Sequence, residues 1–263
     1  MTFPDIFHYF CDMKEKERLL EICADTVFNA LTAQVAGAHR IELCTGLSEG
    51  GTTPSVAQIR EARKSLRILL YVLIRPRGGD FLYSDLECEI MKADIHFCGQ
   101  AGCDGVVIGM LRPNGTVDAE RCRALIAVAR QYGMGVTFHR AFDRSNDLFQ
   151  AMEDVIALGC DRILTSGGYA TAIEGADVIR QLIEKAAGRI VIMPGSGITP
   201  DNAGELIRTT GLKEMHGTFR SRKASAMQYK NAKMNRQKDE YSLMLADAEK
   251  IKAVLECMNN YCR

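Results

Sequence analysis

Residues 18–44, RLLEICADTVFNALTAQVAGAHRIELC, contain the pattern that decides the fold. A short apolar run is followed by a helical pattern over residues 26–36, then by Gly37, and then by a second short apolar run. A glycine directly after a helix supplies the left-handed backbone that turns the chain into the next strand. The stretch therefore predicts a strand–helix–strand unit with two parallel strands.

The same unit recurs along the chain. Strands are predicted over residues 18–23, 40–44, 67–74, 105–109, 135–139, 161–165, 189–193 and 213–216. Helices are predicted over residues 26–36, 55–65, 85–101, 118–132, 147–158, 177–187 and 202–210, with a last helix over about residues 241–258. Eight strands, each followed by a helix, predict an α/β fold, a (βα)8 barrel of the TIM type. An open doubly wound sheet is the alternative, but it usually has a glycine-rich first turn, and residues 23–26 (CADT) do not form one.

We expect a single barrel domain over residues 18–263, preceded by an N-terminal extension over residues 1–17. Two further segments differ from the repeat. Residues 75–85 are too long to be a bare connection after the third strand, so they are a candidate functional loop. Residues 220–238 are basic and contain few apolar residues, which is typical of a solvated loop or a subunit contact.

The composition narrows the class of protein. The 263 residues include 33 lysines and arginines and 33 aspartates and glutamates, so the formal net charge is zero. This balance argues against nucleic acid or an anionic membrane as a partner. The apolar runs are too short to span a bilayer, and the first residues do not match a signal peptide. The ten cysteines are scattered, which favours reduced thiols and a cytoplasmic location.

The polar residues within the strands point to a site. Side chains of a barrel strand alternate between the surrounding helices and the interior. In the first strand Leu20 and Ile22 should face the helices, which turns Glu21 and Cys23 inward. The same alternation places a set of charged or titratable side chains inside, near the carboxyl ends of the strands: Glu21, Glu42, Arg75, His139, Glu214 and His216. Buried charges must be paired or face a ligand, so this layer is either a self-satisfied polar plug or, as we favour, a site at the mouth where barrels place their sites.

Several motifs resemble the CutC copper homeostasis family. They are EICAD at 21–25, IELCTGLSEGGTTPS at 41–55, IRPRGGDF at 74–81, TFHRAFD at 137–143, RILTSGG at 162–168 and MPGSGI at 193–198. The resemblance runs in the same order from about residue 20 to residue 231. It implies a cytosolic barrel linked to copper handling that usually forms a homo-oligomer, here a dimer or a tetramer.

The resemblance also implies two copper ligands, Cys23 and Cys44. Adjacent strands lie about 4.8 Å apart, so inward thiols at their carboxyl ends could share one ion. Soft thiolates suit Cu(I), which makes copper the expected cofactor. Two considerations oppose this interpretation: cysteines are often simply buried, and ionised Glu21 and Glu42 would disfavour a thiolate.

A second hypothesis is a barrel enzyme or sensor that acts on a phosphorylated or carboxylated small molecule. Glycine-containing loops follow the sixth and seventh strands, where barrels commonly bind phosphate through backbone N–H groups. The candidate anion-binding residues are Arg75, Arg77, Arg140, Ser166, Gly167, Gly195, Ser196 and Gly197. The candidate catalytic residues are Glu21, Glu42, His139 and His216, because a histidine beside a carboxylate can transfer protons. Whether the chain is an enzyme stays open at this point.

Overall fold

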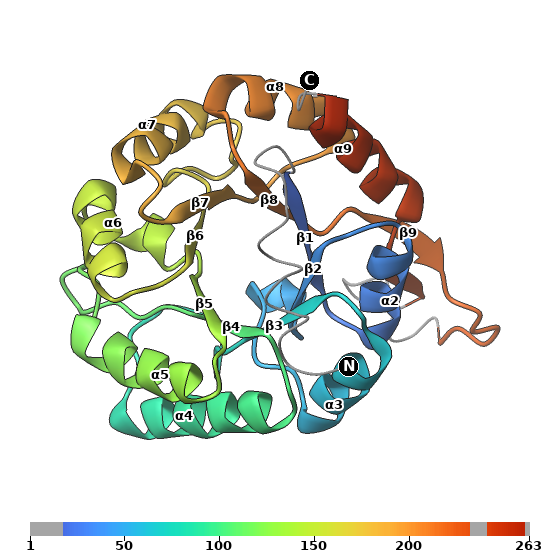
Figure 1. Ribbon diagram of the computed structural model, residues 1–263. Helices are drawn as coiled ribbons and strands as arrows, with labels where there is room; N and C mark the ends of the chain where they lie inside the picture. Colours follow the sequence, from blue (N-terminus) through green and yellow to red (C-terminus); the bar gives the residue numbers. More distant parts are fainter. Residues whose placement is uncertain (1–17, 232–240, 261–263) are drawn as a thin grey trace, which may run out of the picture.

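The computed structural model describes residues 18–231 and 241–260. The predicted N-terminal extension over residues 1–17 therefore lies outside the described residues. Eight parallel strands form one sheet in the order β7-β6-β5-β4-β3-β2-β1-β8, and Figure 1 shows them as an inner ring surrounded by helices. The strands are β1 (Leu19–Ala24), β2 (Arg40–Leu43), β3 (Leu69–Leu73), β4 (Gly105–Ile108), β5 (Gly135–Phe138), β6 (Arg162–Thr165), β7 (Val191–Pro194) and β8 (Glu214–Gly217). The predicted (βα)8 barrel is confirmed.

Helices connect the strands and cover the outside of the ring. They are α2 (Val27–Val35), α3 (Val56–Ser65), α4 (Asp85–Gln100), α5 (Ala119–Gln131), α6 (Leu148–Ala157), α7 (Ala176–Ala186), α8 (Pro200–Thr210) and α9 (Ala248–Asn260), with short 3₁₀ helices η1 (Leu47–Glu49) and η2 (Phe142–Arg144). Capping boxes begin α3 and α4, where Ser55 pairs with Gln58 and Ser84 with Glu87. Such pairs satisfy backbone N–H groups that the first turn leaves free, and they fix where the helix starts.

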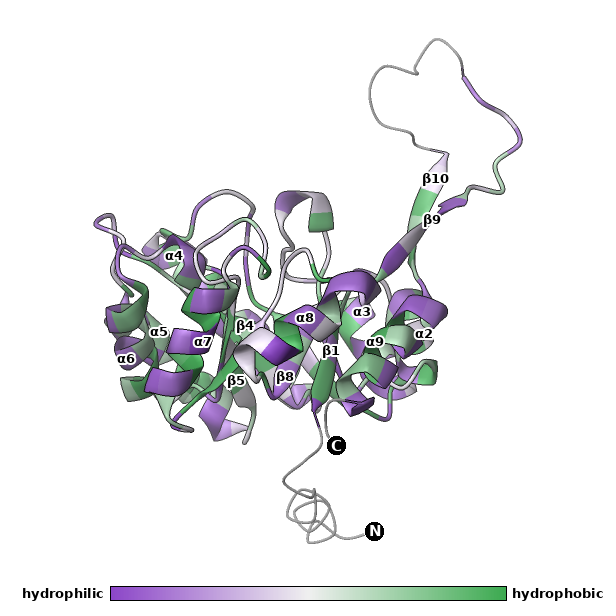
Figure 2. Ribbon diagram, turned by 90° about the horizontal axis from the view of Figure 1, so that it is seen from above, coloured by the Kyte–Doolittle hydropathy of each residue, from purple (hydrophilic) through white to green (hydrophobic). Residues whose placement is uncertain are grey.

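The predicted alternation along the strands separates two apolar clusters. Leu20 and Ile22 belong to the large cluster between strands and helices. Cys23 and Cys44 belong to a small second cluster with Tyr71, Leu73 and Val107, inside the barrel. In Figure 2 the hydrophilic colour concentrates on the outward sides of the helices. The first strand therefore directs its residues as predicted.

The segment after the barrel differs from the prediction. Residues 242–246 were expected to begin the last helix, but they form β10 (Ser242–Ala246), which pairs antiparallel with β9 (Arg220–Ala224). The helical prediction was wrong here because an apolar strand runs directly into an amphipathic helix. Asp247 separates the two, since its carboxylate accepts hydrogen bonds from the N–H groups of Glu249 and Lys250. Figure 2 shows this hairpin projecting away from the barrel.

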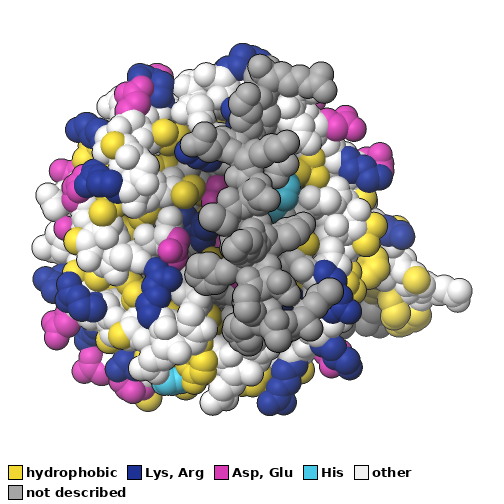
Figure 3. Space-filling view, viewed as in Figure 1, with side chains coloured by type: hydrophobic (Ala, Val, Ile, Leu, Met, Phe, Trp, Pro, Cys, Tyr) yellow, Lys and Arg dark blue, Asp and Glu magenta, His cyan; other side chains and the backbone are white. Residues whose placement is uncertain are grey.

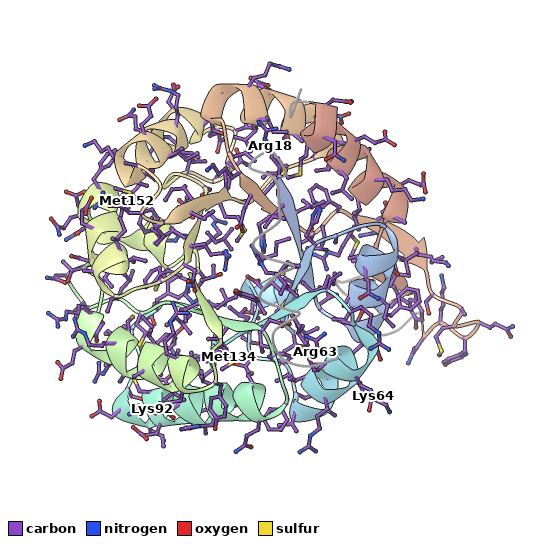
Figure 4. The ribbon with its side chains drawn as sticks, in the orientation of Figure 1. Arg18, Arg63, Lys64, Lys92, Met134 and Met152 are labelled. Carbon is purple, nitrogen blue, oxygen red and sulfur yellow. The ribbon has the colours of Figure 1, made fainter. Side chains whose placement is uncertain are left out.

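The surface agrees with the balanced composition. Figure 3 shows basic and acidic side chains interspersed around the rim of the face in view. Figure 4 shows Lys64 and Lys92 on the outer sides of α3 and α4. Within the described ranges, no helix combines the length and the apolar content needed to cross a bilayer. A homo-oligomer stays a prediction.

A charged network fills the barrel interior beneath the mouth. The Arg40 guanidinium donates hydrogen bonds to Glu21 and to Glu214. Arg162 donates to Glu214 at 3.1 Å and to the Tyr71 hydroxyl at 3.0 Å. Arg40 is only 1% exposed, and the two carboxylates raise its pKa although burial alone would lower it. The predicted polar plug is thus real for Glu21 and Glu214, and it includes two arginines that the sequence pattern did not single out.

Removing the central guanidinium should destabilise the fold strongly. We expect Arg40→Ala to lower the free energy of unfolding by about 3–5 kcal/mol, because the buried carboxylates of Glu21 and Glu214 lose the cation that they share. Urea denaturation at neutral pH measures this value. Arg180→Ala, which removes an exposed pair with Glu184, is the control and should cost less than about 0.5 kcal/mol.

Adding Glu21→Gln and Glu214→Gln to Arg40→Ala should recover part of the loss, because the unpaired charges are then gone. Equal stability of Arg40→Ala and the wild-type protein would show that the network contributes little.

Candidate functional site

A cavity of about 320 Å³ opens at the carboxyl ends of the strands. We call it the mouth cavity. Its wall includes Cys23 from β1, Glu42 from β2 and His216 from β8, together with side chains from the loops after β3, β5 and β7. These strands place their ends together because a parallel barrel has all its carboxyl ends on one face.

Three side chains on adjacent strands form a compact cluster in this wall. A sulfur of Cys23, a carboxylate oxygen of Glu42 and a ring nitrogen of His216 lie within 4.8 Å of one another, and all three residues are buried. The Nδ1 atom of His216 lies 2.7 Å from a Glu21 oxygen. The other Glu21 oxygen accepts from Arg40. The cluster is therefore oriented from below by the charged network.

The electrostatics of the cluster follow from this arrangement. Burial acts to raise the pKa of Glu21, but Arg40 and then His216 outweigh it and lower that pKa to about 2. Burial acts to lower the pKa of His216, but Glu42, Cys23 and Glu21 together raise it well above its usual value. Burial raises the pKa of Glu42. The raised pKa of His216 favours its imidazolium form, which pairs with the Glu21 carboxylate.

The second thiol lies directly behind the first. The sulfur atoms of Cys23 and Cys44 are 3.5 Å apart, and Cys44 is fully buried. The hydrogen bond with Cys44, followed by burial and the charge of Glu42, raises the pKa of Cys23 well above its usual value. Gly51 covers Cys44 with φ of +89°, and a Cβ atom there would lie 2.8 Å from Leu73. Only glycine fits that approach without displacing the wall of the thiol pair.

The comparisons with known proteins agree with the motifs. The profile of the CutC family matches residues 18–221. This chain belongs to the CutC family. It is 46% identical over 240 residues to the human copper homeostasis protein cutC homolog, and the aligned region covers 90% of this chain and 87% of the human protein. It is 45% identical over 246 residues to the CutC family protein of Chromobacterium violaceum, with 92% and 99% covered.

Solved structures give the same result for the fold. The crystal structure of CutC from Streptococcus agalactiae matches with a TM-score of 0.73 and 38% identity, over 76% of this chain and 98% of that one. Phosphoribosylanthranilate isomerase from Thermotoga maritima matches with a TM-score of 0.55 at 13% identity, over 92% of this chain and 99% of that one. The second likeness shows the barrel fold alone.

Arg75 and His139 lie together on another part of the wall of the mouth cavity. Both are 5% exposed. The ring of Phe81 lies between them, with 5.0 Å from its centroid to the Arg75 guanidinium carbon and 5.0 Å to the His139 ring centroid. Phe81 comes from the loop over residues 75–85, which was the candidate functional loop. That loop therefore contributes to the cavity.

The nitrogen atoms of His139 have distinct roles. The backbone N–H of Ala141 donates to Nδ1 at 3.1 Å. An acceptor nitrogen carries no proton, so the neutral ring carries its proton on Nε2. Within the described residues Nε2 has no hydrogen-bond partner. Burial, together with the charge of Arg75, lowers the pKa of His139 to about 3, so the neutral form is present at physiological pH.

The loop after β6 is closed by a carboxylate that the sequence pattern did not single out. Asp143 accepts hydrogen bonds from the backbone N–H groups of Ser166, at 3.0 Å, and of Gly168, at 3.1 Å. Gly167 donates instead to the Thr165 hydroxyl. Asp143 also pairs with Arg140 at 2.8 Å. The only signal for this role was its position three residues after Arg140 in TFHRAFD.

The remaining predicted residues divide between the cavity wall and its surroundings. Arg140, Ser196 and Gly197 line the mouth cavity, whereas Glu21, Cys44, Arg77, Ser166, Gly167 and Gly195 do not. Arg77 is directed toward Glu87 and the carbonyl of Leu82. The predicted anion-binding set is thus not one cluster, and its members at the cavity are Arg75, Arg140, Ser196 and Gly197.

The depressed pKa of His139 predicts that the free energy of unfolding depends on pH. The unfolded chain takes up a proton on this ring below about pH 6.5, while the folded protein does so only near pH 3. The contribution is therefore present above about pH 6.5 and is lost as the pH falls. When the pH falls from about 7 to about 5, this ring should lower the free energy of unfolding of the wild-type protein by up to about 2 kcal/mol. In His139→Asn that part of the decrease should be absent.

Urea denaturation at both pH values measures this difference. Asparagine preserves an acceptor for the Ala141 N–H, and His96→Asn on α4 is the matched control. Identical pH dependence in His139→Asn and wild type would contradict a buried neutral ring.

Proposed function

We propose that this CutC family protein binds Cu(I) in the cytosol through Cys23 and Cys44, for storage or transfer. The observation that carries the proposal is the 3.5 Å separation between the sulfur of Cys23, in the wall of the mouth cavity, and the sulfur of Cys44 behind it. A metal–thiolate bond is about 2.3 Å long, so these atoms are close enough to share one ion. Soft sulfur ligands favour Cu(I) over hard cations.

The surroundings of the thiol pair support the same ligand chemistry. His216 lies within reach of Cys23, and its Nδ1 is bound to Glu21. Metal-binding histidines commonly bind a carboxylate through one nitrogen and the metal through the other. His216 would serve as the third ligand through its other ring nitrogen, once the metal has displaced the proton there, with Glu42 beside it. This donor set fits copper as cargo of the protein.

The raised pKa of the Cys23 thiol fits a site that exchanges its metal. The raised pKa of Cys23 means that copper must displace protons, which lowers the net affinity relative to a preformed thiolate. It also protects the Cys23 thiol from oxidation, since the thiolate is the reactive form. The cysteines in the described part of the chain are all free, which supports a reducing compartment.

Cu(I) titration of the reduced protein against a competing chelator tests the proposal. We expect Cys23→Ser and Cys44→Ser each to weaken binding by at least about tenfold, because a hydroxyl is a poor ligand for a soft ion. Cys257→Ser on α9, far from the mouth, is the control and should bind as the wild type does.

Undiminished Cu(I) affinity in both thiol variants would exclude this site. Tighter binding of Zn(II) than of Cu(I) under the same competition would also contradict the proposal, because cysteine, histidine and carboxylate donors suit zinc as well.

A further inference from the structure

The Arg75 guanidinium is a buried cation whose hydrogen-bond partners are all neutral. Its Nη atoms donate to the backbone carbonyls of Glu49 at 2.8 Å, Gly51 at 2.6 Å and Gly79 at 2.8 Å. Its Nε has no partner among the described residues. Carbonyl oxygens orient a guanidinium, but they do not neutralise its charge.

The other interior charges are balanced. Arg40 lies between Glu21 and Glu214, and Arg162 also pairs with Glu214. His216 pairs with Glu21 and lies close to Glu42. Arg75 forms no ion pair with a carboxylate in residues 18–231 or 241–260. A buried charge without a counter-charge costs several kcal/mol, so its persistence in a cavity wall points to an anion supplied from outside.

His139 adds a neutral donor to this region. Its Nε2 carries the proton, lacks a partner among the described residues and belongs to a side chain that lines the mouth cavity. Phe81 packs against both His139 and Arg75. The three side chains therefore form a rigid group with one positive charge and an available N–H donor.

The loop after β7 supplies more donors. The backbone hydrogen bonds of the described residues include none donated by the N–H groups of Ser196, Gly197 and Ile198, which precede α8. Ser196 has φ of +86°, a conformation that costs a residue with a Cβ about 1–2 kcal/mol. Its hydroxyl donates to the carbonyl of Ala170 at 2.8 Å, which holds it there. Successive free N–H groups before a helix bind anionic oxygens.

We infer that the mouth cavity binds a small organic anion with two acidic ends. One end, a phosphate, takes the N–H groups of Ser196, Gly197 and Ile198. The other, a carboxylate, takes Arg75 and the Nε2–H of His139. A cavity of about 320 Å³ suits a molecule of metabolite size. This site does not include the thiols of the copper proposal and stands independently of it.

Calorimetric titration with phosphoglycolate, which carries a phosphate and a carboxylate, tests the inference. Inorganic phosphate and glycolate are its two halves, and each should bind at least about tenfold more weakly than the whole. We expect thermal stabilisation of the protein by phosphoglycolate that grows with its concentration. All titrations contain a copper chelator.

Two variants locate the site. Arg75→Met and His139→Asn should each weaken phosphoglycolate binding by at least about tenfold. His139→Asn keeps the Ala141 hydrogen bond, so it reports on Nε2 even where Arg75→Met does not fold. Arg77→Met, which alters a neighbouring arginine outside the cavity wall, is the matched control and should bind normally.

Failure of phosphoglycolate to bind the wild-type protein at millimolar concentration would overturn the inference. So would binding that both cavity variants retain in full. Cys23→Ser should bind phosphoglycolate as the wild type does, so loss of copper binding and loss of anion binding are distinguishable outcomes.

Discussion

The interior of this barrel depends on one guanidinium, that of Arg40, held between the carboxylates of Glu21 and Glu214. The neighbouring strands β1 and β8 would otherwise place the like charges of Glu21 and Glu214 in a space that water does not reach. The arginine turns this repulsion into attraction, and Arg162 adds a second positive charge on the other side of Glu214. Because none of these charges could be buried alone, the network requires all four side chains at once. The position of β1 between β2 and β8 is thus fixed electrostatically as well as by backbone pairing.

The network also determines the chemistry above it. Glu21 has two oxygens and uses one for Arg40 and the other for His216. The ring of His216 is thereby held with one nitrogen engaged, and its orientation relative to Cys23 and Glu42 follows. A structural ion pair and a ligand-binding histidine are therefore parts of one chain of contacts, Arg40 to Glu21 to His216. The inward charged side chains that the sequence predicted as one layer form two levels in the structure. In the lower level the positive and negative charges balance, and the upper level faces the mouth cavity.

The sequence was sufficient for the fold because its signals are local. Short apolar strands recur eight times along the chain, and a glycine such as Gly37 follows most of the helices between them, which is the pattern of a βα barrel. Contacts between distant strands could not be read in the same way. Arg40 opens a strand, where an arginine usually reaches solvent, and only closure of the ring brings Glu214 to it. The role of Asp143 was missed for a similar reason, since this residue lies after β5 and its partners in the loop after β6 come more than twenty residues later. The strand β10 was missed because its apolar residues merge with those of α9 when the chain is scanned for a helical period.

The two proposed ligands use different sectors of the same mouth, and charge connects them. Cys23, Cys44, Glu42 and His216 come from the adjacent strands β8, β1 and β2, whereas Arg75, His139 and Ser196 come from the ends of β3, β5 and β7. When two thiols bind one Cu(I) ion and release their protons to solvent, the two thiolates and the ion together carry a net charge of about minus one. An organic anion adds negative charge to the same enclosed volume. Arg75 is a buried cation with no carboxylate partner among the described residues, so its positive charge favours either ligand. A ligand that is already bound offsets part of that charge and leaves less attraction for the other. Copper and the anion should therefore oppose each other electrostatically even though they share no ligand atom, and this coupling is reciprocal by thermodynamic necessity.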